Sequence, residues 1–202
     1  MQGLLYGQDA PNLVEERVNY PFTWKGKVGH WLWETRRNLE KAALSPTGKN
    51  IDDAFAWTEL FLVKSAITIR KLGKSGNIGD EIFHQELTVR RFDLDDLPPE
   101  TLDKTHGDLS IEGEGIERNI QLNTLLNEII HSSVITACKL PSNPNPIGAL
   151  LIGCRGRIEG NNGTPHLLLV DLESLFDSIE SVVRESFDYD KNTGHISLYE
   201  KE

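Results

Sequence analysis

The sequence predicts an α+β fold in which an N-terminal antiparallel helical hairpin packs beside a small antiparallel or mixed sheet with two further helices. Two long segments near the N-terminus show helical periodicity, and shorter apolar runs typical of strands follow them. Two more helical patterns alternate with those runs. With 202 residues, we expect one domain made of a hairpin part, residues 1–79, and an α+β part, residues 80–202.

The hairpin is predicted from two periodic segments. Residues 1–21 contain two prolines and no hydrophobic period, so we expect an irregular arm there. Apolar residues recur at three- and four-residue steps over 22–44 and again over 51–72, which predicts two helices. The break Ser45-Pro46-Thr47-Gly48 between them is short, and this favours an antiparallel hairpin.

The rest of the chain is predicted to alternate strands and helices. In chain order we expect a strand over 86–94, a helix over 119–138, strands over 147–154 and 166–170, a helix capped by Asp171 and a strand over 196–199. The two central strands are joined by a glycine- and asparagine-rich connector, so they are expected to form an antiparallel hairpin. Residues 93–117 are acidic and rich in Pro and Gly, which predicts a loop.

The charge of the chain is −10 and is unevenly distributed. Residues 1–79 hold 11 Lys and Arg against 8 Asp and Glu, whereas residues 80–117 hold 3 against 12. A net acidic chain repels nucleic acid and anionic membranes, so neither is expected as a partner. No signal peptide and no apolar run near the ~20 residues of a membrane span is found, and a cytoplasmic location is expected.

His131 is the candidate catalytic residue. Asn127 and Glu128 precede it by about one helical turn, so a polar patch can form beside an apolar face. A histidine near a carboxylate can act as a general acid or base close to neutral pH. The more common alternative is a structural histidine that hydrogen-bonds to the edge of the sheet.

Other motifs predict no cofactor and no metal site. The sequence has no nucleophile elbow and no phosphate-binding glycine motif. The segment Asp188–Gly194 resembles the start of a calcium-binding loop, but its glycine comes one position late, so a hairpin turn is expected. Asp103, His106 and Asp108 lie in a glycine-rich segment that is a poor preformed metal site. Cys138 and Cys154 match no disulfide framework or zinc pattern.

The hairpin carries the candidate partner-binding residues. All four tryptophans of the chain, Trp24, Trp31, Trp33 and Trp57, lie in it and are expected to form its interior, with room for one of them to be exposed. Tryptophan and arginine are enriched in the residues that dominate binding at protein interfaces. A partner surface is therefore predicted at Trp31, Trp33, Arg36 and Arg37.

The C-terminal half resembles a known group of proteins. The segments Arg91-Phe92-Asp93-Leu94, Leu126–Ser132 and His166–Leu172 resemble a loose group of small, uncharacterised bacterial proteins. In that group a helix carrying Asn-x-x-x-His-Ser precedes a strand pair and a final helix. The resemblance implies a bacterial source and some role for His131, and it implies no activity.

The sequence favours a non-enzymatic interaction or accessory protein that acts with a larger protein partner, in a bacterial defence or regulatory system. This hypothesis rests on the missing catalytic set, the separated charge blocks and the tryptophan-rich hairpin. The alternative is a hydrolase or nucleotide-acting enzyme centred on His131, with Asn127, Glu128 or an acidic residue of 93–117. A third possibility is an inhibitor or antitoxin whose acidic loop mimics nucleic acid.

Overall fold

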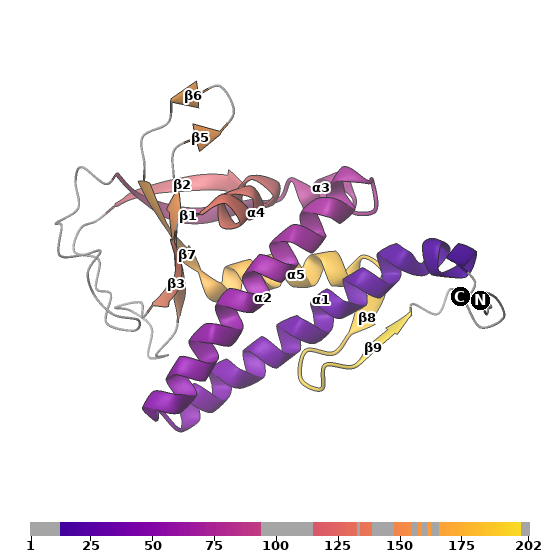
Figure 1. Ribbon diagram of the computed structural model, residues 1–202, viewed down its shortest axis with the longest axis horizontal. Coiled ribbons are helices and arrows are strands. Elements are labelled where there is room, and N and C mark those ends of the chain that lie inside the picture. The colour runs from indigo at the N-terminus through magenta and orange to yellow at the C-terminus, as the bar shows by residue number, and fades with distance from the viewer. Residues whose placement is uncertain are drawn as a thin grey trace, which may run out of the picture.

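Two long helices form a hairpin beside a five-stranded sheet (Figure 1). The helices are α1 (Leu13–Leu44) and α2 (Gly48–Lys74). These elements belong to a computed structural model that describes residues 13–93, 115–132, 134–138, 148–154, 157–158, 161–162 and 166–198. The predicted α+β fold class, with its N-terminal helical hairpin and further helices, is confirmed.

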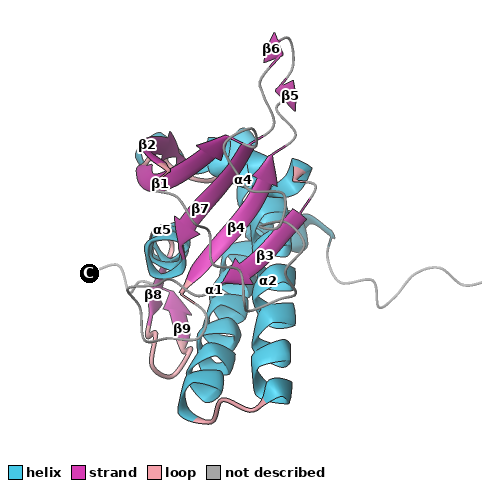
Figure 2. Cartoon of the chain, turned by 90° about the vertical axis from the view of Figure 1, so that its left-hand side faces the viewer, coloured by secondary structure: helices cyan, strands magenta, loops and turns pink. Residues whose placement is uncertain are grey.

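The sheet is antiparallel throughout. Its strands are β1 (Glu86–Asp93), β2 (Ile116–Gln121), β3 (Val134–Cys138), β4 (Ala149–Cys154) and β7 (His166–Asp171), in the order β2-β1-β7-β4-β3. The central strand β7 pairs with β1 through Val89 and Val170, and with β4 through Leu150 and Val170. The predicted hairpin over 147–154 and 166–170 is therefore confirmed as β4 and β7. A small ladder of β5 (Arg157–Ile158) and β6 (Asn161–Asn162) extends from this connection (Figure 2).

Three further helices and a hairpin complete the described chain. They are α3 (Asp80–Phe83), α4 (Leu122–His131), α5 (Leu172–Arg184) and the antiparallel pair β8 (Phe187–Tyr189) and β9 (Ile196–Leu198). Helix α5 begins at the predicted cap, because Asp171 Oδ2 accepts a 2.8 Å hydrogen bond from the Ser174 backbone N–H. Phe176 of α5 packs edge-on against Phe61 of α2, with ring centroids 5.7 Å apart.

The core lies where α2, α4 and α5 bring their apolar faces together and meet the sheet. Helical spacing in each sequence segment supplies one apolar side, and burying these sides drives the packing. The largest fully buried side chains are Tyr189, Phe176, Leu32, Leu62, Ile69, Leu72, Leu122, Leu125, Leu126, Ile129 and Ile152.

The tryptophans do not form the interior of the hairpin, contrary to the sequence prediction. Trp24, Trp31 and Trp33 are half-buried and pack at the border of the core, and Trp57 is 42% exposed. Smaller side chains of α1 such as Val28 and Leu32 are fully buried in the core instead. Two helix backbones approach to about 8–10 Å, and aliphatic residues fill that gap more readily than indole rings.

Two predicted boundaries were wrong. Helix α1 begins at Leu13 and continues through Pro21, so the predicted irregular arm over 1–21 is wrong from residue 13 onward. A proline inside a helix removes one backbone hydrogen bond and kinks the helix, but a long helix can continue past it, so Pro21 does not end α1. The predicted helix over 119–138 is helical only as α4, because its start belongs to β2 and its end to β3. The β-branched run Val134-Ile135-Thr136 favours a strand, and Ile120 pairs with Leu87 of β1.

The loop predicted over 93–117 falls mostly on residues that the structure does not describe. Its first residue, Asp93, belongs to β1, and its last two residues, Ile116 and Glu117, belong to β2. Among the helices of the described ranges, none combines the length and the apolar character needed to cross a membrane.

Candidate functional site

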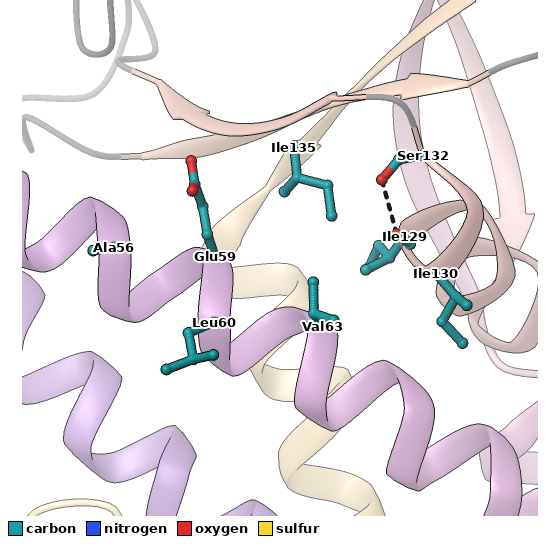
Figure 3. Close-up of a pocket in the computed structure, with 8 residues that line it drawn as sticks. All are labelled: Ala56, Glu59, Leu60, Val63, Ile129, Ile130, Ser132 and Ile135. Atoms are coloured by element: carbon teal, nitrogen blue, oxygen red, sulfur yellow. Dashed lines mark hydrogen bonds between the residues drawn. The ribbon is translucent and has the colours of Figure 1, made fainter.

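An open apolar groove lies between α2 and the C-terminal end of α4 (Figure 3). Its volume is about 560 Å³. Helix α2 forms one wall, α4 forms the opposite wall, and Ser132 and, on β3, Ile135 close one side. The lining residues are Ala56, Glu59, Leu60, Val63, Ile129, Ile130, Ser132 and Ile135. Six of the eight side chains are apolar, so the groove suits an apolar ligand surface.

The groove exists because α4 is much shorter than α2. Helix α4 has 10 residues and α2 has 27, which correspond to about 15 and 40 Å of helix. Ser132 caps the end of α4, where its Oγ donates a 2.8 Å hydrogen bond to the Ile129 carbonyl oxygen (Figure 3). The chain then turns into β3, and part of the apolar side of α2 remains uncovered by α4.

The apolar surface continues from the groove onto the outer face of α2. Leu60 is 46% exposed and lines the groove, while Trp57 and Ile67 on the same helix are 42% and 52% exposed. Contiguous apolar side chains at a protein surface mark interaction sites more often than isolated ones do. Lys64 lies among them and places its Nζ 5.6 Å from the centre of the Trp31 ring on α1.

His131 lies at the end of α4, next to the groove-lining residues Ile130 and Ser132. Its side chain is exposed, and its Nε2 is 3.5 Å from Nη1 of Arg70 on α2. Asn127 and Glu128 are half-buried on the preceding turn of α4. The His131 ring therefore contacts an arginine from another helix. Sequence reasoning missed Arg70, because only the packing of α4 on α2 brings the two residues together.

The four predicted partner-binding residues are divided between separate places. Trp31 lies beneath Lys64, next to the outer face of α2. Trp33 lies against the turn between β8 and β9, and its Nε1 donates a 3.4 Å hydrogen bond to the Asn192 carbonyl oxygen. The Arg37 guanidinium is 5.4 Å from the centre of the Trp33 ring. The structure therefore brings Trp33 and Arg37 together and keeps Trp31 apart from them.

Arg36 is bound within the chain. Its guanidinium donates to Glu180 at 2.5 Å and to Asp177 at 3.1 Å, and the arginine side chain is only 12% exposed. Burial acts to lower the pKa of Arg36, but the hydrogen bond and the charge of Glu180 outweigh it and raise that pKa. These contacts hold α1 against α5, so the structure gives Arg36 a stabilising role.

The segment that resembles a calcium loop forms the turn of the β8–β9 hairpin. Asp190 accepts hydrogen bonds from the Asn192 backbone N–H at 2.9 Å and from Thr193 Oγ1 at 2.7 Å. The hydrogen bonds from Thr193 and Asn192 lower the pKa of Asp190. Across the described ranges, no group of three or more His, Cys, Asp and Glu side chains is arranged to hold a metal ion. Asp103, His106 and Asp108 and the side chains of Cys138 and Cys154 lie outside the part that is described.

Comparison with known proteins returned no family model, no curated protein and no solved structure that matches this chain significantly.

Proposed function

We propose that this protein is a non-enzymatic interaction or accessory protein that binds a larger protein partner in the groove between α2 and α4. It would do so in the cytoplasm of a bacterium, as part of a defence or regulatory system. One observation carries the proposal: the apolar lining of the groove continues onto the surface through Leu60, which is 46% exposed. A groove of this kind accepts the apolar side of a helix or an extended segment.

The net charge of the two long helices favours an acidic partner segment. Residues 23–74 of the two long helices hold ten Lys and Arg against five Asp and Glu, although the whole chain has a charge of −10. At the end of the groove near His131, α2 carries Arg70, whose Nη1 lies 3.5 Å from Nε2 of His131. Basic side chains beside an apolar groove steer an acidic partner to it and fix its orientation. We therefore expect apolar anchor residues in the partner with Asp or Glu beside them.

Two substitutions test the groove: one lies in its lining, and the other is a control on the edge strand β2. Ile130→Glu places a charge in the lining of the groove, whereas Ile116→Glu removes an exposed isoleucine from the edge strand β2. The wild-type chain and both variants are tagged and used to capture partners from the native host lysate, followed by mass spectrometry. The proposal expects a stoichiometric partner with the wild type and Ile116→Glu, and its loss with Ile130→Glu.

Two results would count against the proposal. If Ile130→Glu is folded and retains the partner, the partner binds elsewhere. If the purified protein instead turns over a substrate many times and His131→Ala abolishes that reaction, the enzyme hypothesis replaces the interaction hypothesis.

A further inference from the structure

Helix α2 carries a regular row of exposed side chains. We call this row the α2 stripe: Asp53, Trp57, Leu60, Lys64, Ile67 and Lys71, all of them exposed. The steps between successive members alternate between four and three residues. That spacing places side chains along one line of a helix and is typical of the seam between two packed helices.

The α2 stripe is complementary to itself. Its members lie in pairs at equal distances on either side of Leu62, namely Asp53 with Lys71, Trp57 with Ile67, and Leu60 with Lys64. If a second copy of α2 packs antiparallel on the first, each member faces its counterpart on the other copy. The acidic residue then meets a basic residue at both ends of the seam, and the two largest apolar residues meet between the ends and the centre.

A parallel arrangement does not have this property. In a parallel pair with two-fold symmetry, Asp53 would face Asp53 and Lys71 would face Lys71, so like charges would repel at both ends. Asp53 and Lys71 are 18 positions apart on α2, or about 27 Å, and cannot pair within one chain. Of the two arrangements of a second copy, the charges of the stripe therefore favour the antiparallel one.

Lys64 near the centre is compatible with this seam. Its Nζ lies 5.6 Å from the Trp31 ring centre of its own chain, at the side of the stripe. The charge is thus held at the rim while the methylene groups are free to cover a facing leucine. A single lysine in an otherwise apolar seam also fixes the register and the number of helices.

We infer that the protein forms an antiparallel homodimer with two-fold symmetry through the outer face of α2. This inference is independent of the proposed partner in the groove, because it concerns the purified chain alone. The two surfaces share Leu60, whereas Ile130 belongs to the groove and Ile67 to the stripe. Loss of the partner in Ile130→Glu can therefore be separated from loss of the dimer in Ile67→Glu.

The test exchanges charges at the two ends of the stripe. Asp53→Lys and Lys71→Asp each place like charges opposite one another twice in the dimer. Sedimentation velocity of each variant at low salt should show dimerisation weakened about tenfold or more relative to wild type, so that the monomer is favoured. Asp52→Lys makes the same change of charge one residue away from the stripe, on an exposed position, and should leave the dimer as in wild type.

Mixing the two variants gives the decisive result. In a heterodimer of Asp53→Lys with Lys71→Asp, Lys faces Asp at both ends, so the mixture should recover the wild-type dimer mass. The double variant Asp53→Lys/Lys71→Asp should recover it too. The inference is overturned if the wild type remains a monomer across the accessible concentration range, if both single variants dimerise as well as wild type, or if the mixture stays monomeric.

Discussion

Arg36 of α1 and Glu180 of α5 form a 2.5 Å hydrogen-bonded ion pair between residues 144 positions apart in the chain. Their side chains are 12% and 10% exposed. Glu180 also accepts a 2.7 Å hydrogen bond from Arg184, one turn along α5. The Arg36 guanidinium lies 5.6 Å from the centre of the Phe176 ring. One largely buried charge pair therefore joins the hairpin to the helix that follows the sheet.

Removing one partner of this pair should cost more than removing both. Arg36→Leu leaves the Glu180 carboxylate in a low-exposure site with Arg184 as its remaining cation, and we expect a loss of about 2–4 kcal/mol in the free energy of unfolding. In Arg36→Leu/Glu180→Leu no buried charge is left unpaired, so the double variant should lose less than either single variant does. Urea denaturation of the four proteins measures this. Additive losses would show that the pair is not coupled.

Because of the same pair, we expect the stability of the folded protein to depend on pH in the acid range. Burial acts to raise the pKa of Glu180, but the hydrogen bonds and charges of Arg36 and Arg184 outweigh it, so the pKa lies below its ordinary value of 4.5. A carboxyl group whose pKa is lowered in the folded state contributes stability above its unfolded value. That contribution is lost as the pH falls below 4.5 and through the folded-state pKa.

Glu180→Gln isolates this contribution. The variant should melt below wild type at neutral pH, and the two melting temperatures should converge as the pH falls through the acid range. Glu173→Gln is a matched control on α5, because Glu173 is 64% exposed and lies 3.8 Å from Arg36. Its melting curve should follow that of wild type at every pH. A constant difference between Glu180→Gln and wild type down to acid pH would contradict the assignment.

The fold could be predicted from the sequence where the hydrophobic period of a segment and its length indicated the same type of element. The helical patterns over 51–72 and from Asp171 onward are long and regular, and both became helices with the expected boundaries to within a few residues. The segment 119–138 was misread because its apolar residues fit a helix locally. Its two ends became strands through pairing with β1 and β4, which are distant partners that a local pattern does not contain.

Replacement by alanine should destabilise the protein to different extents at two glycines that have the same backbone conformation. Gly76 and Gly194 have φ values of 70° and 69°. A Cβ at Gly76 would meet nothing within 4 Å, whereas at Gly194 it would lie 2.6 Å from atoms of the Trp33 ring. Gly76→Ala should therefore cost about 1 kcal/mol for its backbone conformation alone. Gly194→Ala should cost about 1–3 kcal/mol more, because the ring must move.

Thermal unfolding measures the loss of stability in each variant, and tryptophan fluorescence reports whether the Trp33 ring moves. Gly194→Ala should lower the melting temperature further than Gly76→Ala and should also change the emission of Trp33. Equal melting temperatures for the two variants would mean that the β8–β9 turn does not press on Trp33. The result bears on partner binding, since the turn contacts the predicted binding residue Trp33, and Arg37 lies over the Trp33 ring.

The candidate site was predictable only in part, for a physical reason. A sequence shows which residues share a helix face, so His131 and Asn127 could be grouped. It does not show which helix lies opposite, so neither Arg70 beside His131 nor the groove wall formed by α2 could be named. Arg36 was assigned to a partner surface because arginine and tryptophan are enriched at protein interfaces, and its actual partners on α5 are more than 130 residues away in the chain.

His131→Ala should leave the fold almost unchanged. The side chain is exposed, and its hydrogen-bonding contact is the 3.5 Å approach to Arg70, so the free energy of unfolding should change by no more than about 0.5 kcal/mol. His84→Ala is the matched control, since His84 is also an exposed histidine near the end of a helix, with its Nδ1 3.0 Å from the Asp80 carbonyl oxygen. Urea denaturation of both variants is the measurement. A large loss in His131→Ala alone would assign the ring a structural role at its contact with Arg70 of α2. If both variants fold as wild type and only His131→Ala loses the captured partner, His131 and Arg70 form the polar end of the groove, because the neighbouring apolar lining is intact in that variant.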